Sequence, residues 1–186
     1  MSLHEFLAEY GYLAVFAGAL LEGEVVLVLA GFAAHQGYLQ LPIVMAVAFC
    51  GGTLGDQCFY FLGRRWGEAL LGRLPARFES KADLVNRLLL RYHAWVIVLI
   101  RFMYGLRTIG PIVIGMSDVP PPRFLRFNLL GAAIWAVLVA GIGFLFGHSL
   151  HGLVARGGHV EEYGALAVFA LIGLVAVVHR FMSRSR

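Results

Sequence analysis

The stretch Ala94–Met116 has the sequence AWVIVLIRFMYGLRTIGPIVIGM. It is as long and apolar as a membrane segment, which needs about 20 mostly apolar residues. Charged and helix-breaking residues interrupt it: Arg101, Gly105, Arg107, Gly110 and Pro111. Charge together with Gly and Pro inside an apolar run predicts a broken or re-entrant segment. Backbone that lacks helical hydrogen bonds is tolerated at membrane depth only against protein or a water-filled cavity.

The composition of the whole chain points to a membrane protein. Of its 186 residues, 60% are hydrophobic and 14% are charged, against about 25% charged residues in a typical soluble domain. The mean hydropathy is +0.78. We therefore predict a single membrane domain over residues 1–186. Nucleic-acid binding is not expected, because the basic residues lie at the ends of apolar segments and form no stripe.

Four further apolar stretches are present: Gly11–Ala34, Leu41–Leu62, Phe124–Phe146 and Tyr163–Val178. The last three are predicted to span the membrane, with a C-terminal transmembrane helix at about residues 160–182. Gly11–Ala34 is interrupted by Glu22-Gly23-Glu24, so we expect another re-entrant hairpin there. A full crossing by this stretch is the alternative.

The distribution of basic residues predicts the orientation. The segment Arg64–His93 holds seven basic and three acidic residues, which places it in the cytoplasm by the positive-inside rule. Arg180, Arg184 and Arg186 place the C-terminus there as well. Both flanks of Ala94–Met116 are basic, and a re-entrant hairpin keeps both on one side.

The two halves of the chain resemble each other weakly. Each has an interrupted apolar stretch followed by a spanning helix, over about residues 11–63 and 94–147, at a spacing of about 80 residues. Opposite orientation of two such units is the inverted-repeat plan of many transporters. We therefore predict an all-α integral membrane fold with two re-entrant helical hairpins, within a core at residues 8–150.

Three carboxylates lie inside apolar stretches: Glu22, Glu24 and Asp56. An ionised group at membrane depth costs several kcal/mol, so it faces a cavity or a partner. Such groups are candidates for exchanging protons in a polar cleft. The alternatives are that both glutamates end a segment in water, and that Asp56 makes a structural hydrogen bond beside the Gly51/Gly55 pattern.

Arg101 and Arg107 are candidates for binding an anionic head group, because guanidinium stays charged and grips phosphate or carboxylate with two parallel hydrogen bonds. Gly23, Gly105, Gly110 and Pro111 are the expected hairpin backbone, where broken helices free N–H groups. The alternative is that both arginines pair internally with the three acids and only hold the fold together. The two interpretations are compatible.

No catalytic nucleophile, cofactor motif or metal-ligand spacing is found, so we expect neither an enzyme, a cofactor nor a metal site. Cys50 and Cys58 share one apolar stretch and are expected to be buried thiols. The GxxxG patterns at Gly51/Gly55 and Gly143/Gly147 permit a homodimer and equally permit packing inside one protomer.

The motifs taken together resemble the DedA family (the SNARE-associated or VTT domain), and most closely its YohD-like branch. The resemblance covers about residues 8–150. It is carried by Glu22-Gly-Glu24, Ala30-Gly-Phe32, Leu54-Gly-Asp56-Gln57, Arg101-Phe-Met-Tyr-Gly-Leu-Arg107, and Asn128-Leu-Leu-Gly131 with Trp135. The Pro-x-Pro-Gly-Glu run usual in the family is missing here, and Tyr104 stands where many members have Pro.

This resemblance implies an inner-membrane transporter linked to the proton-motive force. The expected partners are protons and an anionic lipid such as undecaprenyl phosphate or a phospholipid, which the protein would flip across the bilayer. Two other functions stay open: a proton-coupled exporter or ion antiporter for small solutes, and a membrane organiser whose charges are internal struts.

Overall fold

The computed structural model describes residues 3–21, 23–71, 76–103 and 106–154. These residues form helices joined by turns, with no strand among them. In chain order the elements are α1 (Leu3–Leu21), α2 (Glu24–His35), α3 (Leu41–Leu71), α4 (Ala76–Tyr92), η1 (His93–Trp95), α5 (Val96–Leu99), η2 (Ile100–Phe102), α6 (Ile109–Met116) and α7 (Pro121–Val154). The prediction of an all-α protein is confirmed. The predicted helix at 160–182 lies outside the described residues.

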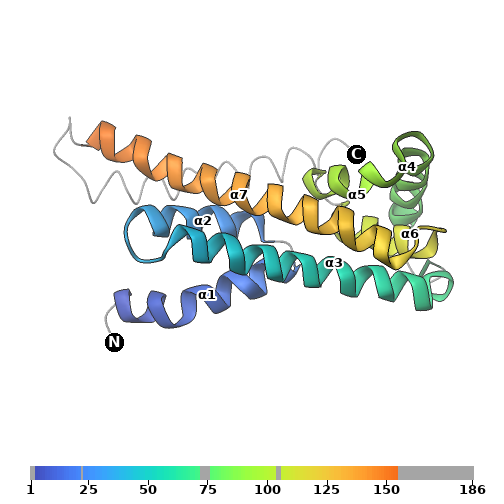
Figure 1. Cartoon of the computed structure of the whole chain (residues 1–186), viewed down its shortest axis with the longest axis horizontal. Coiled ribbons are helices and arrows are strands. Elements are labelled where there is room, and N and C mark those ends of the chain that lie inside the picture. The colour runs from blue at the N-terminus through green and yellow to red at the C-terminus, as the bar shows by residue number, and fades with distance from the viewer. Residues whose placement is uncertain (1–2, 22, 72–75, 104–105, 155–186) are drawn as a thin grey trace.

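Two long helices, α3 and α7, run antiparallel along the long axis (Figure 1). Within the described residues, Leu41–Gly67 and Pro121–Gly147 are the helices long and apolar enough to cross a membrane, at 27 residues each. That length is about 40 Å, against about 30 Å for the hydrocarbon core. Exposed apolar side chains cover their outer faces. Cys50 and Cys58 are exposed on α3 too, so the expectation of buried thiols is wrong.

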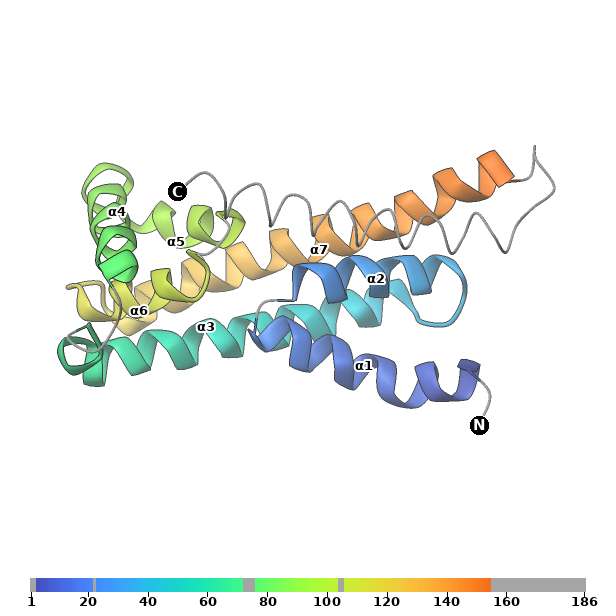
Figure 2. The ribbon, with the colours of Figure 1, turned by 180° about the vertical axis from the view of Figure 1, so that it is seen from behind.

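The first hairpin is made by α1 and α2. Helix α1 ends at Leu21 and helix α2 begins at Glu24, and the chain reverses direction between the two helices (Figures 1 and 2). Residues 11–34 therefore do not form one continuous spanning helix. Gly23 allows the tight reversal, because an added Cβ would overlap the backbone of Gly18. At the other end of α2, Gly37 has a φ of +83°, which favours glycine.

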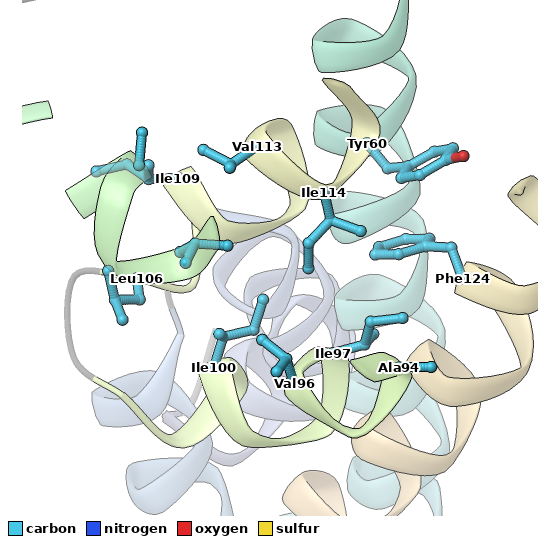
Figure 3. Close-up of a cluster of buried hydrophobic side chains, with 12 residues drawn as sticks. Tyr60, Ala94, Val96, Ile97, Ile100, Leu106, Ile109, Val113, Ile114 and Phe124 are labelled. Atoms are coloured by element: carbon cyan, nitrogen blue, oxygen red, sulfur yellow. The ribbon is translucent and has the colours of Figure 1, made fainter. Parts of the chain in front are cut away.

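The second hairpin enters from the opposite end of the molecule. Elements α5 and η2 run toward the middle, Met103 is extended with φ −95° and ψ 111°, and α6 runs back. Buried side chains of the two arms pack together (Figure 3). Gly110 and Pro111 lie in the first turn of α6, where a missing N–H costs nothing. The helix therefore breaks before these two residues and not at them, while Gly105 lies outside the described residues.

Glycines allow each hairpin to pack closely on the long helix of the other half. An added Cβ at Gly31 of α2 would overlap the carbonyl oxygen of Ala140 in α7, and one at Gly143 would overlap that of Val28. Contact of this kind at small residues is typical of membrane helices.

The second hairpin repeats this arrangement on α3. An added Cβ at Gly115 of α6 would overlap the carbonyl oxygen of Tyr60, and one at Gly63 of α3 would overlap that of Ile112. The returning arm of each hairpin thus contacts the long helix of the other half through reciprocal glycines.

The GxxxG patterns also pack inside the protomer. Gly51 and Gly55 of α3 face the backbone of α1, and Gly147 of α7 faces His35 of α2, as Gly143 faces Val28. These glycines bring helices of one chain together, so they give no support for a dimer.

Candidate functional site

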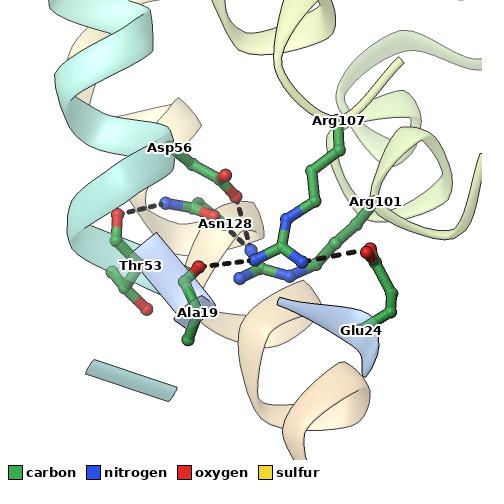
Figure 4. Close-up of polar contacts among 7 residues, drawn as sticks. All are labelled: Ala19, Glu24, Thr53, Asp56, Arg101, Arg107 and Asn128. Atoms are coloured by element: carbon green, nitrogen blue, oxygen red, sulfur yellow. Dashed lines mark hydrogen bonds and ion pairs between the residues drawn. The ribbon is translucent and has the colours of Figure 1, made fainter. Parts of the chain in front are cut away.

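The tips of the two hairpins meet beside α3 and α7, near the middle of the molecule (Figures 1 and 4). Four of the predicted charged residues come together there. Glu24 begins α2, Asp56 lies on α3, Arg101 lies in η2, and Arg107 lies in the turn before α6. The fifth, Glu22, lies outside the described residues.

Arg101 is held at one end of its guanidinium group. Its Nη1 donates to Asp56 Oδ2 at 2.5 Å and to Asn128 Oδ1 at 2.9 Å. The Asn128 Nδ2 in turn donates to the carbonyl oxygen of Thr53 at 3.1 Å. Helices α3 and α7 are therefore joined through one buried arginine, whose residue exposure is 3%.

The other edge of the same guanidinium packs beside Gly52 and makes no hydrogen bond to a described residue. Nε and Nη2 of Arg101 are buried and have no hydrogen-bond partner in the part of the chain that the structure describes. These two nitrogens form the side-on fork that binds carboxylate or phosphate with two parallel hydrogen bonds. An unpaired buried donor is costly, so this edge is suited to an anionic or polar ligand.

Arg107 joins the two hairpin tips. Its Nη2 donates to the carbonyl oxygen of Ala19 at 2.8 Å, and its Nη1 donates to Glu24 Oε1 at 3.1 Å. Ala19 lies in the last turn of α1, where carbonyls lack helical partners, so the arginine caps this helix. The Arg107 side chain is 4% exposed and that of Glu24 is 39% exposed. The carboxylate therefore lies at the open side of the site.

Trp135 of α7 provides an aromatic surface for both arginines. The guanidinium carbon of Arg107 lies 4.2 Å from its ring centroid, and that of Arg101 lies 5.2 Å away. Gly52 provides the space beside them, because an added Cβ would overlap Nη2 of Arg101 and lie 3.5 Å from Nη2 of Arg107. Two positive groups thus converge on one buried point.

Sequence reasoning missed three members of this cluster as site residues: Thr53, Asn128 and Trp135. Asn128 is the most informative of them, because a lone amide inside the apolar stretch of α7 signals a buried hydrogen-bond partner. Side-chain oxygens of Thr53 and Gln57 and the indole N–H of Trp135 also lack partners among the described residues. In the same part of the chain, no group of three or more His, Cys, Asp or Glu could hold a metal ion.

Comparison with known proteins identifies the family. The profile of the VTT domain matches residues 21–145, which contain all four charged residues. The chain is 43% identical to the inner membrane protein YohD of Escherichia coli over 79% of this chain and 76% of that protein.

Two further relatives are uncharacterized membrane proteins. One, from Synechocystis, is 30% identical over 98% of this chain and 89% of its own length. The other, from Mycobacterium leprae, is 30% identical over 90% of this chain and 75% of its own length. No solved structure matches the chain significantly. The sequence match and the helical fold agree, and the chain belongs to the DedA family of VTT-domain membrane proteins.

Proposed function

We propose that this protein is a transporter that flips an anionic, phosphate-bearing lipid across the inner membrane, using the proton-motive force. Undecaprenyl phosphate or a phospholipid is the proposed substrate class. The observation that carries the proposal is the buried, unpaired Nε–Nη2 edge of Arg101, beside the second guanidinium of Arg107. The protein is proposed to act as a transporter and not as an enzyme.

The hairpin lengths support re-entry from opposite faces of the bilayer. The returning arms α2 and α6 have 12 and 8 residues. At 1.5 Å per residue they extend about 18 Å and about 12 Å, which is too short to cross a core of about 30 Å. The reciprocal glycine contacts of α2 on α7 and of α6 on α3 support an inverted repeat. In this orientation the basic end and the C-terminus face the cytoplasm.

A lipid phosphate suits the site for chemical reasons. Arg101 offers a fork that is already oriented by Asp56 and Asn128, so little conformational entropy is lost on binding. A phosphate oxygen reaching Arg107 would compete with Glu24 for that guanidinium. Protonation of Glu24 would weaken its pair with Arg107 and favour the phosphate. Release of that proton from Glu24 on the other side of the membrane would restore the pair and release the lipid.

The test uses full-length protein reconstituted into liposomes with a fluorescent polyprenyl phosphate, whose exposure in each leaflet is followed by a membrane-impermeant quencher. Arg101→Lys keeps the charge and removes the fork. Arg126→Lys, an exposed arginine on α7, is the matched control. Loss of a double charge-assisted hydrogen bond of about 1.5–3 kcal/mol predicts a rate about 10- to 100-fold lower for Arg101→Lys.

The control should flip lipid at the wild-type rate. Equal rates for wild type and Arg101→Lys, or a wild-type rate no higher than that of protein-free liposomes, would overturn the proposal. A parallel assay with an internal pH dye tests the small-solute alternative. Proton flux that responds to a soluble anion, with no lipid flipping, would favour an exporter or antiporter.

A further inference from the structure

A cavity of about 470 Å³ lies at the α4 end of the molecule, away from the hairpin tips. It is formed where α4 meets the turn between α6 and α7. It has both apolar and polar walls. Its lining includes Asn86, Leu89, Leu90, Ser117, Asp118 and Arg123. None of these takes part in the site at the hairpin tips, so the inference does not depend on the proposed function.

Two opposite charges line this cavity without pairing. Asp118 lies in the turn after α6, and Arg123 lies in the first turn of α7. In the part of the chain that the structure describes, neither forms an ion pair with the other or with a third residue. A cavity that presents separate negative and positive groups is complementary to a zwitterion, in which each charge meets its opposite.

The backbone around these two residues is fixed. Ser117 Oγ donates to the carbonyl oxygen of Ile114 at 2.7 Å and accepts from Val119 N at 3.4 Å. The N–H of Arg123 donates to the carbonyl oxygen of Pro120 at 3.0 Å. Hydrogen-bonded turns therefore hold the backbone on both sides of Asp118, while the two charged side chains are exposed.

The side chains around the cavity are of the kinds found at the membrane–water interface. Helix α4 stands across the end of the long helices (Figures 1 and 2). Next to it, Tyr92 is 41% exposed and Trp95 is 57% exposed, and such aromatics are typical of the membrane–water interface. Leu90 is 80% exposed beside the cavity, where an apolar side chain can contact acyl chains.

We propose that this cavity binds the head group of a resident phospholipid that carries a phosphate and a primary ammonium. Arg123 binds the phosphate, while the Asp118 carboxylate and the Asn86 amide oxygen accept hydrogen bonds from the ammonium. Leu89 and Leu90 contact the first part of the acyl chains. A quaternary ammonium has no N–H to donate, so a choline lipid loses the hydrogen bonds on the Asp118 side.

The test is native mass spectrometry of the full-length protein in detergent, titrated with ethanolamine, choline and glycerol phospholipids of identical acyl chains. Asp118→Asn and Arg123→Gln are the test variants. Asp83→Asn on α4 and Arg126→Gln on α7 are matched controls, since both side chains are exposed and neither lines the cavity. A thermal melt of each variant confirms folding.

The wild type should bind the ethanolamine lipid about fivefold more tightly than the choline lipid, as expected for the loss of hydrogen bonding worth about 1 kcal/mol. Asp118→Asn should abolish that preference, and Arg123→Gln should weaken the binding of all three lipids. Equal wild-type binding of ethanolamine and choline lipids, or a preference that survives Asp118→Asn, would overturn the proposal. Competition by soluble glycerophosphoethanolamine at equal concentration would overturn the assignment to a lipid.

Discussion

The buried pair of Asp56 and Arg101 predicts a separation between stability and transport. In Asp56→Asn, Arg101 stays buried and charged with no counter-ion. In Arg101→Met, the Asp56 carboxylate stays buried and loses its arginine partner. Side-chain exposures of 2% for Arg101 and 10% for Asp56 mean that water cannot replace the lost partner. Breaking a buried pair costs about 3–5 kcal/mol, a large part of the total stability of about 5–15 kcal/mol.

The double variant Asp56→Asn/Arg101→Met contains neither charge. Its free energy of unfolding should be closer to the wild-type value than that of either single variant. The coupling energy between the two positions should be at least about 2 kcal/mol. The assay is reversible unfolding in mixed micelles, followed by circular dichroism. Exposed Asp83→Asn and Arg126→Met, on α4 and α7, are the matched controls and should each change the free energy by less than about 0.5 kcal/mol.

The same three proteins are then tested for lipid flipping. The double variant should be folded and inactive, because the fork of Arg101 is gone. If it regained the wild-type rate, Arg101 would be a strut and the head-group role assigned to it would be refuted. If instead the double variant were as unstable as the sum of the singles, the two charges would be independent, and the reasoning from the buried pair would fail.

Three further predictions concern single residues. Gly52→Ala should lower the flipping rate at least tenfold by displacing the guanidinium of Arg101. Gly141→Ala, whose added methyl group meets open space, should keep the wild-type rate. Equal flipping rates for the two variants would show that the position of the guanidinium is unimportant. Gly37→Ala should lower the free energy of unfolding by about 1 kcal/mol because its φ is +83°, measured by unfolding in mixed micelles, and an unchanged value would contradict the strain. Glu24→Gln should remove the acceleration of flipping by an imposed pH gradient, because the neutral side chain cannot release Arg107 on protonation; an unchanged response to the gradient would place the proton on another group.

The sequence was sufficient to select the charged residues of the site. Glu24, Asp56, Arg101 and Arg107 stood out because charge inside an apolar stretch is expensive, and the structure brings these four together. Their pairing could not be predicted, because it depends on contacts between residues 45 and 83 positions apart. Only the tertiary fold decides which carboxylate meets which arginine.

The local errors have physical reasons. Helix breaks were expected at Gly105 and at Gly110-Pro111. Gly105 lies outside the described residues. A proline in the first turn of a helix costs no hydrogen bond, so Gly110 and Pro111 lie in the first turn of α6 and do not break a helix. The exposure of Cys50 and Cys58 depends on which side of α3 faces outward. An apolar helix with lipid on one side and protein on the other gives little sequence signal for that choice.

The strut and the transporter are not competing interpretations of Arg101. A buried ion pair is weak support for stability, since apolar residues of similar volume are often as stable or better. A pair retained only as a strut would be expected to satisfy the whole guanidinium. Here Asp56 and Asn128 both bind Nη1, and Nε and Nη2 are left without partners among the described residues. Holding one end of a planar group fixes the direction of its other edge, so the ion pair with Asp56 would also set the direction of the proposed head-group fork.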